Sequence, residues 1–434
     1  MTNTMQQQDA KWPLWQKLAF RFFCIYFLLQ ITPWTWLNSF VKPLNYVTNF
    51  YSLFINWVVN LLNTYWFHFE KTNIVNNGSG DTSENWKQVF AFLTIALIFS
   101  LLWGVIDRKR NSYQTANYWL RTFLRYYLIM MCFIYGIDKL YALQMPFPNQ
   151  SQLATPLGDF LPMRFSWMFI GYSTPYEMFS GAMEVLAGLL LLNRRTITLG
   201  LFVGLAVLTN VMVLNLCYDI PVKLFSMHLV IYCLYLLFND CKRLFDFFVF
   251  NKAVPENTIN EFRFAKKWMR ITGIVMKIVF LGLFVITPFF TTREFYKSLV
   301  KTGNSGQIRP GLYDVTVFAL NKDTIPALIK DTLRWKDVVF EKDGGGSVGS
   351  TDTSFRQRYR RGYFNFIPDS SKQTILFKKS TNTIFTLHYN LPDSNTITLW
   401  GSNKRDSLYV VLKKSNRHFQ LAERQFHWIS EANR

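Results

Sequence analysis

The stretch RTFLRYYLIMMCFIYGIDKL, residues 121–140, decides the class of fold. It is apolar over most of its length, and its charged residues lie near its two ends. An apolar run of about 20 residues is long enough to cross the hydrocarbon core of a bilayer as a helix. The sequence therefore predicts a membrane-spanning helix over about 119–142.

Six further apolar runs of similar length surround this stretch, and we expect each to span a membrane. They are residues 18–38, 86–106, 176–193, 197–217, 221–240 and 268–290. Residues 41–67 are aromatic but interrupted by Asn and Pro, so an amphipathic interfacial segment is preferred there over an eighth span. The predicted fold class for residues 1–290 is a membrane all-α helical bundle of about seven transmembrane helices.

The composition agrees with a membrane protein. Of the 434 residues, 50% are hydrophobic, 18% are aromatic and only 17% are charged, whereas a soluble domain has about 25% charged residues. This composition excludes a disordered chain and argues against an ordinary cytosolic enzyme. The net charge of +20 suits the flanks of membrane helices, so we expect the lipid bilayer, and not nucleic acid, as the partner.

The positions of Lys and Arg predict the orientation. They occur at Arg108–Arg110, Arg194–Arg195 and Lys242–Arg243, whereas the connections near 144–175 and 217–222 are poor in basic residues. Basic loops remain in the cytoplasm. We therefore expect a cytoplasmic N-terminus and a periplasmic or extracellular C-terminal domain, in a multi-pass protein of a bacterial inner membrane.

Residues 291–434 have a different pattern. No apolar run there is long enough to span, and hydrophobic and polar residues alternate in short segments instead. The clearest of these segments are residues 374–380, 383–391, 396–402 and 407–415. They predict an exported, mainly antiparallel β domain, a meander forming a small barrel or a sandwich. Residues 343–350, DGGGSVGS, are predicted to be a flexible loop within it.

Ionisable residues inside spans are costly and are candidates for function. Lys139 and Glu184, on consecutive predicted spans, are the candidate catalytic pair. The alternatives are that Lys139 extends its ammonium to the membrane interface and that Glu184 belongs to a structural ion pair. The candidate ligand-binding residues are Tyr135, Asp138, Glu177, Asp219, Lys223 and His228. His228 points about 140° away from Lys223 on the helix, and a hydrogen-bonded packing role is the alternative for it. All of these residues project toward the outer half of the bilayer or its edge.

At these residues the chain resembles the DoxX family of four-helix membrane proteins. The resemblance lies in residues 124–140 and 179–200 and in the following helices, a core of about 118–240. Gly136, Lys139 and Leu140 match its first motif, and Glu184 and Gly188 match its second. A more distant likeness is to vitamin K-dependent carboxylases, whose catalytic lysine lies in a comparable helix end. The full carboxylase motif is absent, so carboxylation is not expected.

Some DoxX-like proteins are described as subunits of quinone-linked oxidoreductases. The resemblance therefore implies a quinone-interacting subunit with a cavity open to the outer face and a redox partner subunit. Lys139 would contact a quinone oxygen, Glu184 would balance or relay the proton, and His228 would assist. No metal or nucleotide cofactor is expected.

The alternative is a non-enzymatic role: lipid or lipoprotein handling, or anchoring of an envelope complex, by the β domain. Phe419, Phe426, His427 and Trp428 in its tail would dock on the membrane surface or on the bundle. Whether the protein is an enzyme stays open at this point.

Overall fold

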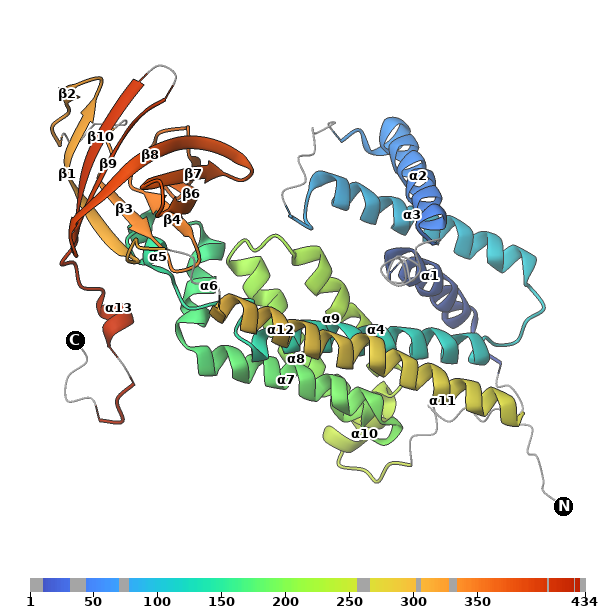
Figure 1. Ribbon diagram of the computed structural model, residues 1–434. Coiled ribbons are helices and arrows are strands. Elements are labelled where there is room, and N and C mark those ends of the chain that lie inside the picture. The colour runs from blue at the N-terminus through green and yellow to red at the C-terminus, as the bar shows by residue number, and fades with distance from the viewer. Residues whose placement is uncertain are drawn as a thin grey trace. The chain divides into compact units, whose positions relative to one another are not determined.

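The computed structural model describes residues 11–31, 44–69, 78–255, 266–301, 306–327, 334–403, 406–424 and 426–429. The chain forms two compact units (Figure 1). The helical unit comprises Met1–Ile137 and Ser180–Ile286, and the barrel unit comprises Asp138–Phe179 and Thr287–Arg434. The boundary between the units falls within α4 (Gln114–Leu140) and within α7 (Thr174–Leu192).

The predicted spans are helical. The helices are α1 (Leu14–Ile31), α2 (Leu44–Leu62), α3 (Ser83–Ile106), α4 (Gln114–Leu140), α7 (Thr174–Leu192), α8 (Ile197–Cys217), α9 (Lys223–Phe238), α10 (Cys241–Phe248), α11 (Lys267–Leu281) and α12 (Thr287–Lys301). A π-helical segment joins α11 to α12. Among the described residues, six helices have the length and hydropathy of a membrane span, and α9 with α10, which are bent by 77°, would make a seventh. The predicted helical bundle is thus confirmed at the level of its helices; residues 32–38 of the first predicted span lie outside the described residues.

Hydrogen bonds near the helix termini show which termini lie at the same end of the helical unit. The Trp12 N–H donates to the Asn111 carbonyl at 3.0 Å, so α1 begins where α3 ends. The Tyr235 hydroxyl donates to Asn117 at 3.2 Å, which places the last turns of α9 beside the first turn of α4. At the opposite end, the Gly80 N–H ahead of α3 donates to the Pro221 carbonyl ahead of α9. Helices α1 and α4 therefore run opposite to α3 and α9.

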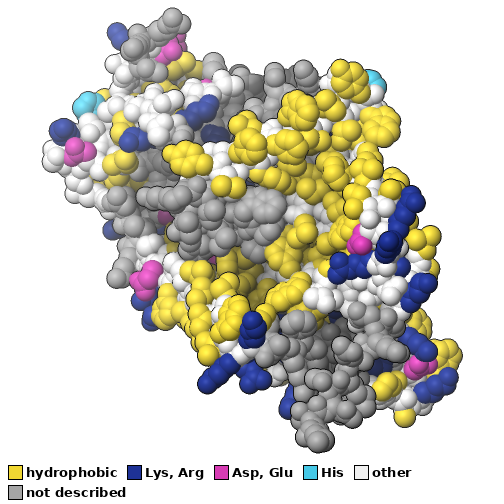
Figure 2. All heavy atoms as spheres, turned by 90° about the vertical axis from the view of Figure 1, so that its right-hand side faces the viewer, with side chains coloured by type: hydrophobic (Ala, Val, Ile, Leu, Met, Phe, Trp, Pro, Cys, Tyr) yellow, Lys and Arg dark blue, Asp and Glu magenta, His cyan; other side chains and the backbone are white. Residues whose placement is uncertain are grey.

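The connection that contains α2 starts and finishes at the same end of the helical unit. Helix α1 packs along α3, and α1 begins where α3 ends, so α1 ends near the start of α3. The connection that contains α2 therefore makes no net crossing. Phe50, Leu53 and Trp57 on α2 are each at least 60% exposed, and Figure 2 shows a broad face of hydrophobic side chains with Lys and Arg gathered at its edge. These features favour the interfacial interpretation of residues 41–67 over an eighth span.

The C-terminal domain is a closed, eight-stranded antiparallel barrel. Its strands are β1 (Gly311–Leu320), β3 (Asp337–Phe340), β4 (Gly345–Val348), β6 (Arg361–Asp369), β7 (Thr374–Lys379), β8 (Asn382–Asp393), β9 (Thr396–Asn403) and β10 (Asp406–Lys414). Each pairs with the next in this order, and β10 pairs with β1 to close the barrel. Short strands β2 (Asp323–Thr324) and β5 (Arg356–Arg358) pair at the margins. Of the two predicted architectures, the barrel is correct, and the four predicted strands correspond to β7–β10.

The prediction of a flexible loop at 343–350 is wrong, because residues 345–348 form strand β4. A Cβ on Gly346 would lie 2.5 Å from the Val339 carbonyl oxygen and 2.6 Å from the Phe364 ring. Glycine is therefore required there for close strand packing. Only Gly344, with φ of +84°, has the left-handed backbone of a turn.

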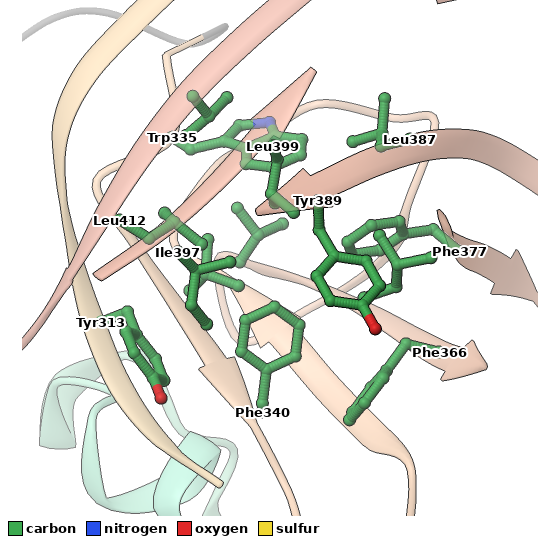
Figure 3. Packing of buried hydrophobic residues seen from close by; sticks show 14 of the residues in the cluster. Tyr313, Trp335, Phe340, Phe366, Phe377, Leu387, Tyr389, Ile397, Leu399 and Leu412 are labelled. Atoms are coloured by element: carbon green, nitrogen blue, oxygen red, sulfur yellow. The ribbon is translucent and has the colours of Figure 1, made fainter. Parts of the chain in front are cut away.

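Aromatic side chains fill the barrel interior (Figure 3). Phe340 packs edge-on to Phe366 with ring centroids 5.0 Å apart, and Phe364 packs against Phe377 at 4.8 Å. Trp335 lies against Phe318 and Phe355 in the same cluster. A small barrel whose inward residues are this large is a packed core.

The connection between α4 and α7 is docked on the barrel. It contains α5 (Gln150–Leu153) and α6 (Pro162–Tyr172), the latter starting with proline, which suits a first helical position. The Ser151 amide and hydroxyl both donate to Glu341 Oε1 at 2.8 Å, and Arg360 pairs with Asp159 at 3.2 Å. This connection and the barrel must therefore lie on the same side of any membrane that α4 and α7 cross.

Candidate functional site

Helices α4 and α7 approach each other through glycines. A Cβ on Gly136 would lie 2.8 Å from Val185 Cγ2 and 3.0 Å from the Gly181 carbonyl oxygen. One turn further along α7, a Cβ on Gly188 would lie 3.1 Å from the Phe133 ring. Small residues allow helix backbones in a membrane to pack closely.

The two candidate catalytic residues lie one turn from this glycine contact but on opposite sides of it, because α4 and α7 run in opposite directions there. Lys139 follows Gly136 by three residues on α4, and Glu184 follows Gly181 by three residues on α7. Residues three apart share a helix face. Lys139 is 4% exposed and Glu184 is 3% exposed. Both helices have the composition of membrane spans, where a buried charge requires compensation by a partner, by protonation or by water.

Glu177 is a candidate ligand-binding residue that is buried, hydrogen-bonded and close to a positive charge. It lies in the first turn of α7, where the helix dipole favours a carboxylate, and it is fully buried. Its Oε1 accepts the Met145 N–H at 2.8 Å, and the positive charge of Lys139 acts on it. Its Oε2 is also buried and has no hydrogen-bond partner among the described residues.

The backbone that holds Glu177 depends on a second glycine contact. A Cβ on Gly171, near the end of α6, would lie 2.7 Å from the Pro146 carbonyl oxygen and closer still to that of Met145. Glycine at 171 therefore lets residues 145–146 reach Glu177. The hydropathy pattern carries no signal for this contact, because it depends on residues 26 positions apart in the chain.

Asp138 and Tyr135 contact other helices. Thr292 on α12 donates to Asp138 Oδ1 at 3.2 Å, so this carboxylate joins the end of α4 to α12. The Tyr135 ring lies 5.7 Å from the Phe225 ring on α9. Each of these residues therefore contributes to helix packing in the structure.

Asp219 and Lys223 form the local pair that their spacing predicts. Lys223 Nζ lies 2.6 Å from Asp219 Oδ1. It also lies 3.8 Å from Asp81, and the Asp81 carboxylate accepts the Lys223 and Leu224 N–H groups at 2.8 and 2.9 Å. The N-terminal residue of α9 is preceded by Val222, which has no capping side chain, so Asp81 caps the helix from a distant loop.

Sequence reasoning missed this role of Asp81. A Gly-rich segment such as the one around it is typical of a solvent-exposed turn, yet Asp81 is largely buried against the start of α9. A helix start without a capping residue of its own was the available signal, although it does not identify the residue that supplies the cap.

Both ring nitrogens of His228 are occupied. Nδ1 lies 2.6 Å from the Leu224 carbonyl oxygen and Nε2 lies 2.7 Å from the Tyr26 hydroxyl. Because a carbonyl only accepts, Nδ1 carries the proton and Nε2 accepts from Tyr26. His228 thus has the surroundings of a hydrogen-bonded packing residue that joins α9 to α1.

Together, the fold and these buried charges define a class: a helical protein with six or seven span-like helices and a C-terminal eight-stranded barrel, which suggests a membrane protein. No family model matches the chain, and no solved structure matches it. The chain is 34% identical over 125 residues to the uncharacterized protein YwoB of Bacillus subtilis (strain 168), a match covering 29% of this chain and 79% of YwoB. The chain belongs to the YwoB family. That membership assigns no activity, because YwoB is itself uncharacterized.

Proposed function

We propose that Lys139 and Glu177 form a polar centre that binds the head of an apolar redox molecule, a quinone, and that Glu184, further along α7, relays a proton. The protein would then be a quinone-interacting subunit of a membrane oxidoreductase. The observation that carries this proposal is the burial of charges of both signs, each less than 5% exposed, beside a glycine-packed contact of two span-like helices. Ionisable residues inside membrane helices mark ligand or proton pathways.

The chemistry of the three side chains suits a quinone head group. The Lys139 ammonium can donate a hydrogen bond to a carbonyl oxygen, and a carboxylate can accept one from a hydroxyl. Glu177 Oε2 offers an acceptor that is not used by the described residues. A quinone, when bound, takes up two electrons and two protons; Lys139 and Glu184 would move the protons, and a partner subunit would supply the electrons.

We further propose that this centre opens toward the outer face of a bacterial inner membrane. The contacts at the helix ends support alternating directions of the spans. Between the α4–α7 connection and the barrel lie α7, α8, α9 with α10, and α11 with α12, an even number of crossings. Such a number agrees with their docking in one unit. The basic loops then face the cytoplasm and the barrel faces outward.

The alternative function, lipid handling by the barrel, has weaker support, since aromatic side chains occupy the barrel interior. One observation favours an anchoring role instead. Phe426 is 76% exposed and Trp428 is 92% exposed, whereas Phe419 packs against Leu312 and Val339. Aromatic residues exposed in this way suit a membrane interface or a partner in an envelope complex.

Lipid extraction of the purified full-length protein, followed by mass spectrometry, tests the proposal. We expect a co-purifying quinone that is lost in the variants Lys139→Met and Glu184→Gln while the folded yield is largely kept. Lys297→Met and Glu294→Gln are matched controls, because these residues form an exposed ion pair on α12. Equal quinone retention in all four variants, or its absence from the wild type, would reject the proposal. A co-purifying phospholipid or acylated peptide would favour the alternative.

A further inference from the structure

Two buried arginines lie near the opposite end of α4 from Lys139. Arg121 and Arg125 are one helical turn apart, and they are 5% and 8% exposed. Three of their buried nitrogens, Nε and Nη1 of Arg121 and Nε of Arg125, have no hydrogen-bond acceptor within the described part of the chain. Buried donors of a charged group are costly to leave unsatisfied, so a ligand that accepts hydrogen bonds is indicated.

The charges around this pair are predominantly positive. Asp240 lies near Arg121, and Arg194 lies near Arg125, whose guanidinium is 5.2 Å from the centre of the Tyr126 ring. Asp240 is already shared, since Arg243 Nη2 lies 3.4 Å and Thr198 Oγ1 lies 3.2 Å from its Oδ2. One carboxylate therefore faces several guanidinium groups, and the excess charge favours an anion.

The adjoining helix α10 indicates where this anion comes from. The chain bends by 77° between α9 and α10, so the two helices cannot both run along the membrane normal. Helix α10 carries Lys242 and Arg243, while Phe245, Phe247 and Phe248 are each more than half exposed. A short helix with basic and aromatic residues after such a bend suits the boundary between headgroups and acyl chains.

We propose that Arg121 and Arg125, with Arg243 at its edge, form a site for the phosphate of an anionic phospholipid headgroup. A guanidinium matches the geometry of a phosphate by donating two parallel hydrogen bonds. Basic pockets between membrane helices on the cytoplasmic side bind headgroups of this kind. The site is separate from the polar centre proposed above, since Arg125 precedes Lys139 by 14 residues, about 21 Å along one helix.

The full-length protein in detergent tests this site with three probes: phosphatidylglycerol, phosphatidylcholine and inorganic phosphate. We expect phosphatidylglycerol to raise the melting temperature and to remain bound in native mass spectrometry, with phosphatidylcholine and phosphate having little effect. In Arg121→Gln/Arg125→Gln the affinity for phosphatidylglycerol should fall about tenfold or more. Arg108→Gln/Lys109→Gln removes the same charge from an exposed loop and should bind as the wild type does.

The outcomes of these experiments distinguish a lipid site from the alternatives. Equal binding of phosphatidylglycerol by the two double variants would overturn the site, as would a wild type that phosphatidylglycerol does not stabilise or that phosphatidylcholine stabilises equally. Stabilisation by phosphate alone, to the extent given by the lipid, would overturn the lipid assignment in favour of a free oxyanion. If the Arg121→Gln/Arg125→Gln protein fails to fold, Arg243→Gln replaces it: this variant should bind phosphatidylglycerol more weakly than Arg108→Gln/Lys109→Gln does, and equal binding would overturn the site.

Discussion

Replacing Gly171 by Ala tests the backbone that holds Glu177. The new Cβ would lie 2.7 Å from the Pro146 carbonyl oxygen and closer to that of Met145. These atoms belong to the backbone, so they cannot move away by a side-chain rotation. Residues 145–146 must therefore shift away from α6, and the Met145 N–H then loses its bond to Glu177 Oε1, which is 2.8 Å long.

The expected loss of stability has two parts. Overpacking costs about 1–3 kcal/mol, and the loss of a hydrogen bond to a charged group costs about 1.5–3 kcal/mol. Together these give about 2.5–6 kcal/mol. For a unit of this size, each kcal/mol lowers the melting temperature by about 2–4 °C, so the variant should melt about 10 °C below the wild type.

Thermal melting of the purified full-length protein, followed by size-exclusion chromatography, measures this effect. Gly158→Ala is the matched control in the same connection, because no atom lies within 4 Å of a Cβ at that position. Adding Glu177→Gln to Gly171→Ala should change little, since the hydrogen bond is already lost. A Gly171→Ala protein that melts with the wild type, or a Gly158→Ala protein that falls equally, would refute the reasoning.

Two further predictions concern the barrel and the start of α9. Burial raises the pKa of Tyr363 above its ordinary value of 10.0, so the neutral phenol stabilises the fold below about pH 10 and this contribution is lost as the pH rises through the folded pKa. Tyr363→Phe should therefore lose less melting temperature than the wild type between about pH 9 and pH 11; identical pH profiles would contradict this. Asp81→Ala removes the cap of α9 and should cost about 1–2 kcal/mol in thermal or denaturant unfolding, whereas Asp219→Ala, at an exposed partner of the same lysine, should cost less than about 1 kcal/mol. Equal losses in these two variants would exclude the capping role.

Local patterns in the sequence determined the helices and several strands. Runs such as 119–142 and 197–217 are apolar over the length of a span, and the corresponding helices α4 and α8 form. The alternation in 374–415 likewise predicts β7–β10. These predictions succeed because the burial period of a helix or a strand repeats within a few residues, so neighbouring positions carry the information.

The closure of the barrel depended on pairing between distant segments. Strand β1 pairs with β10 through positions such as Tyr313 and Lys414, about 100 residues apart, and no local pattern distinguishes this closure from a sandwich. Strand β4 is mostly Gly and Ser, so its composition indicates a loop. It becomes a strand because it pairs with β3 and β6 on its two sides, and the Val339 backbone and the Phe364 ring leave no room for a Cβ at Gly346.

For the candidate site, the sequence identified which residues are unusual, and the tertiary structure decided their partners. Ionisable residues such as Glu177 and His228 are conspicuous in apolar helices whatever the fold. Their partners, the Met145 amide and the Tyr26 hydroxyl, lie 32 and 202 residues away. A hydrogen bond requires atoms within about 3 Å, and only the packing of the helices brings such distant residues to that distance.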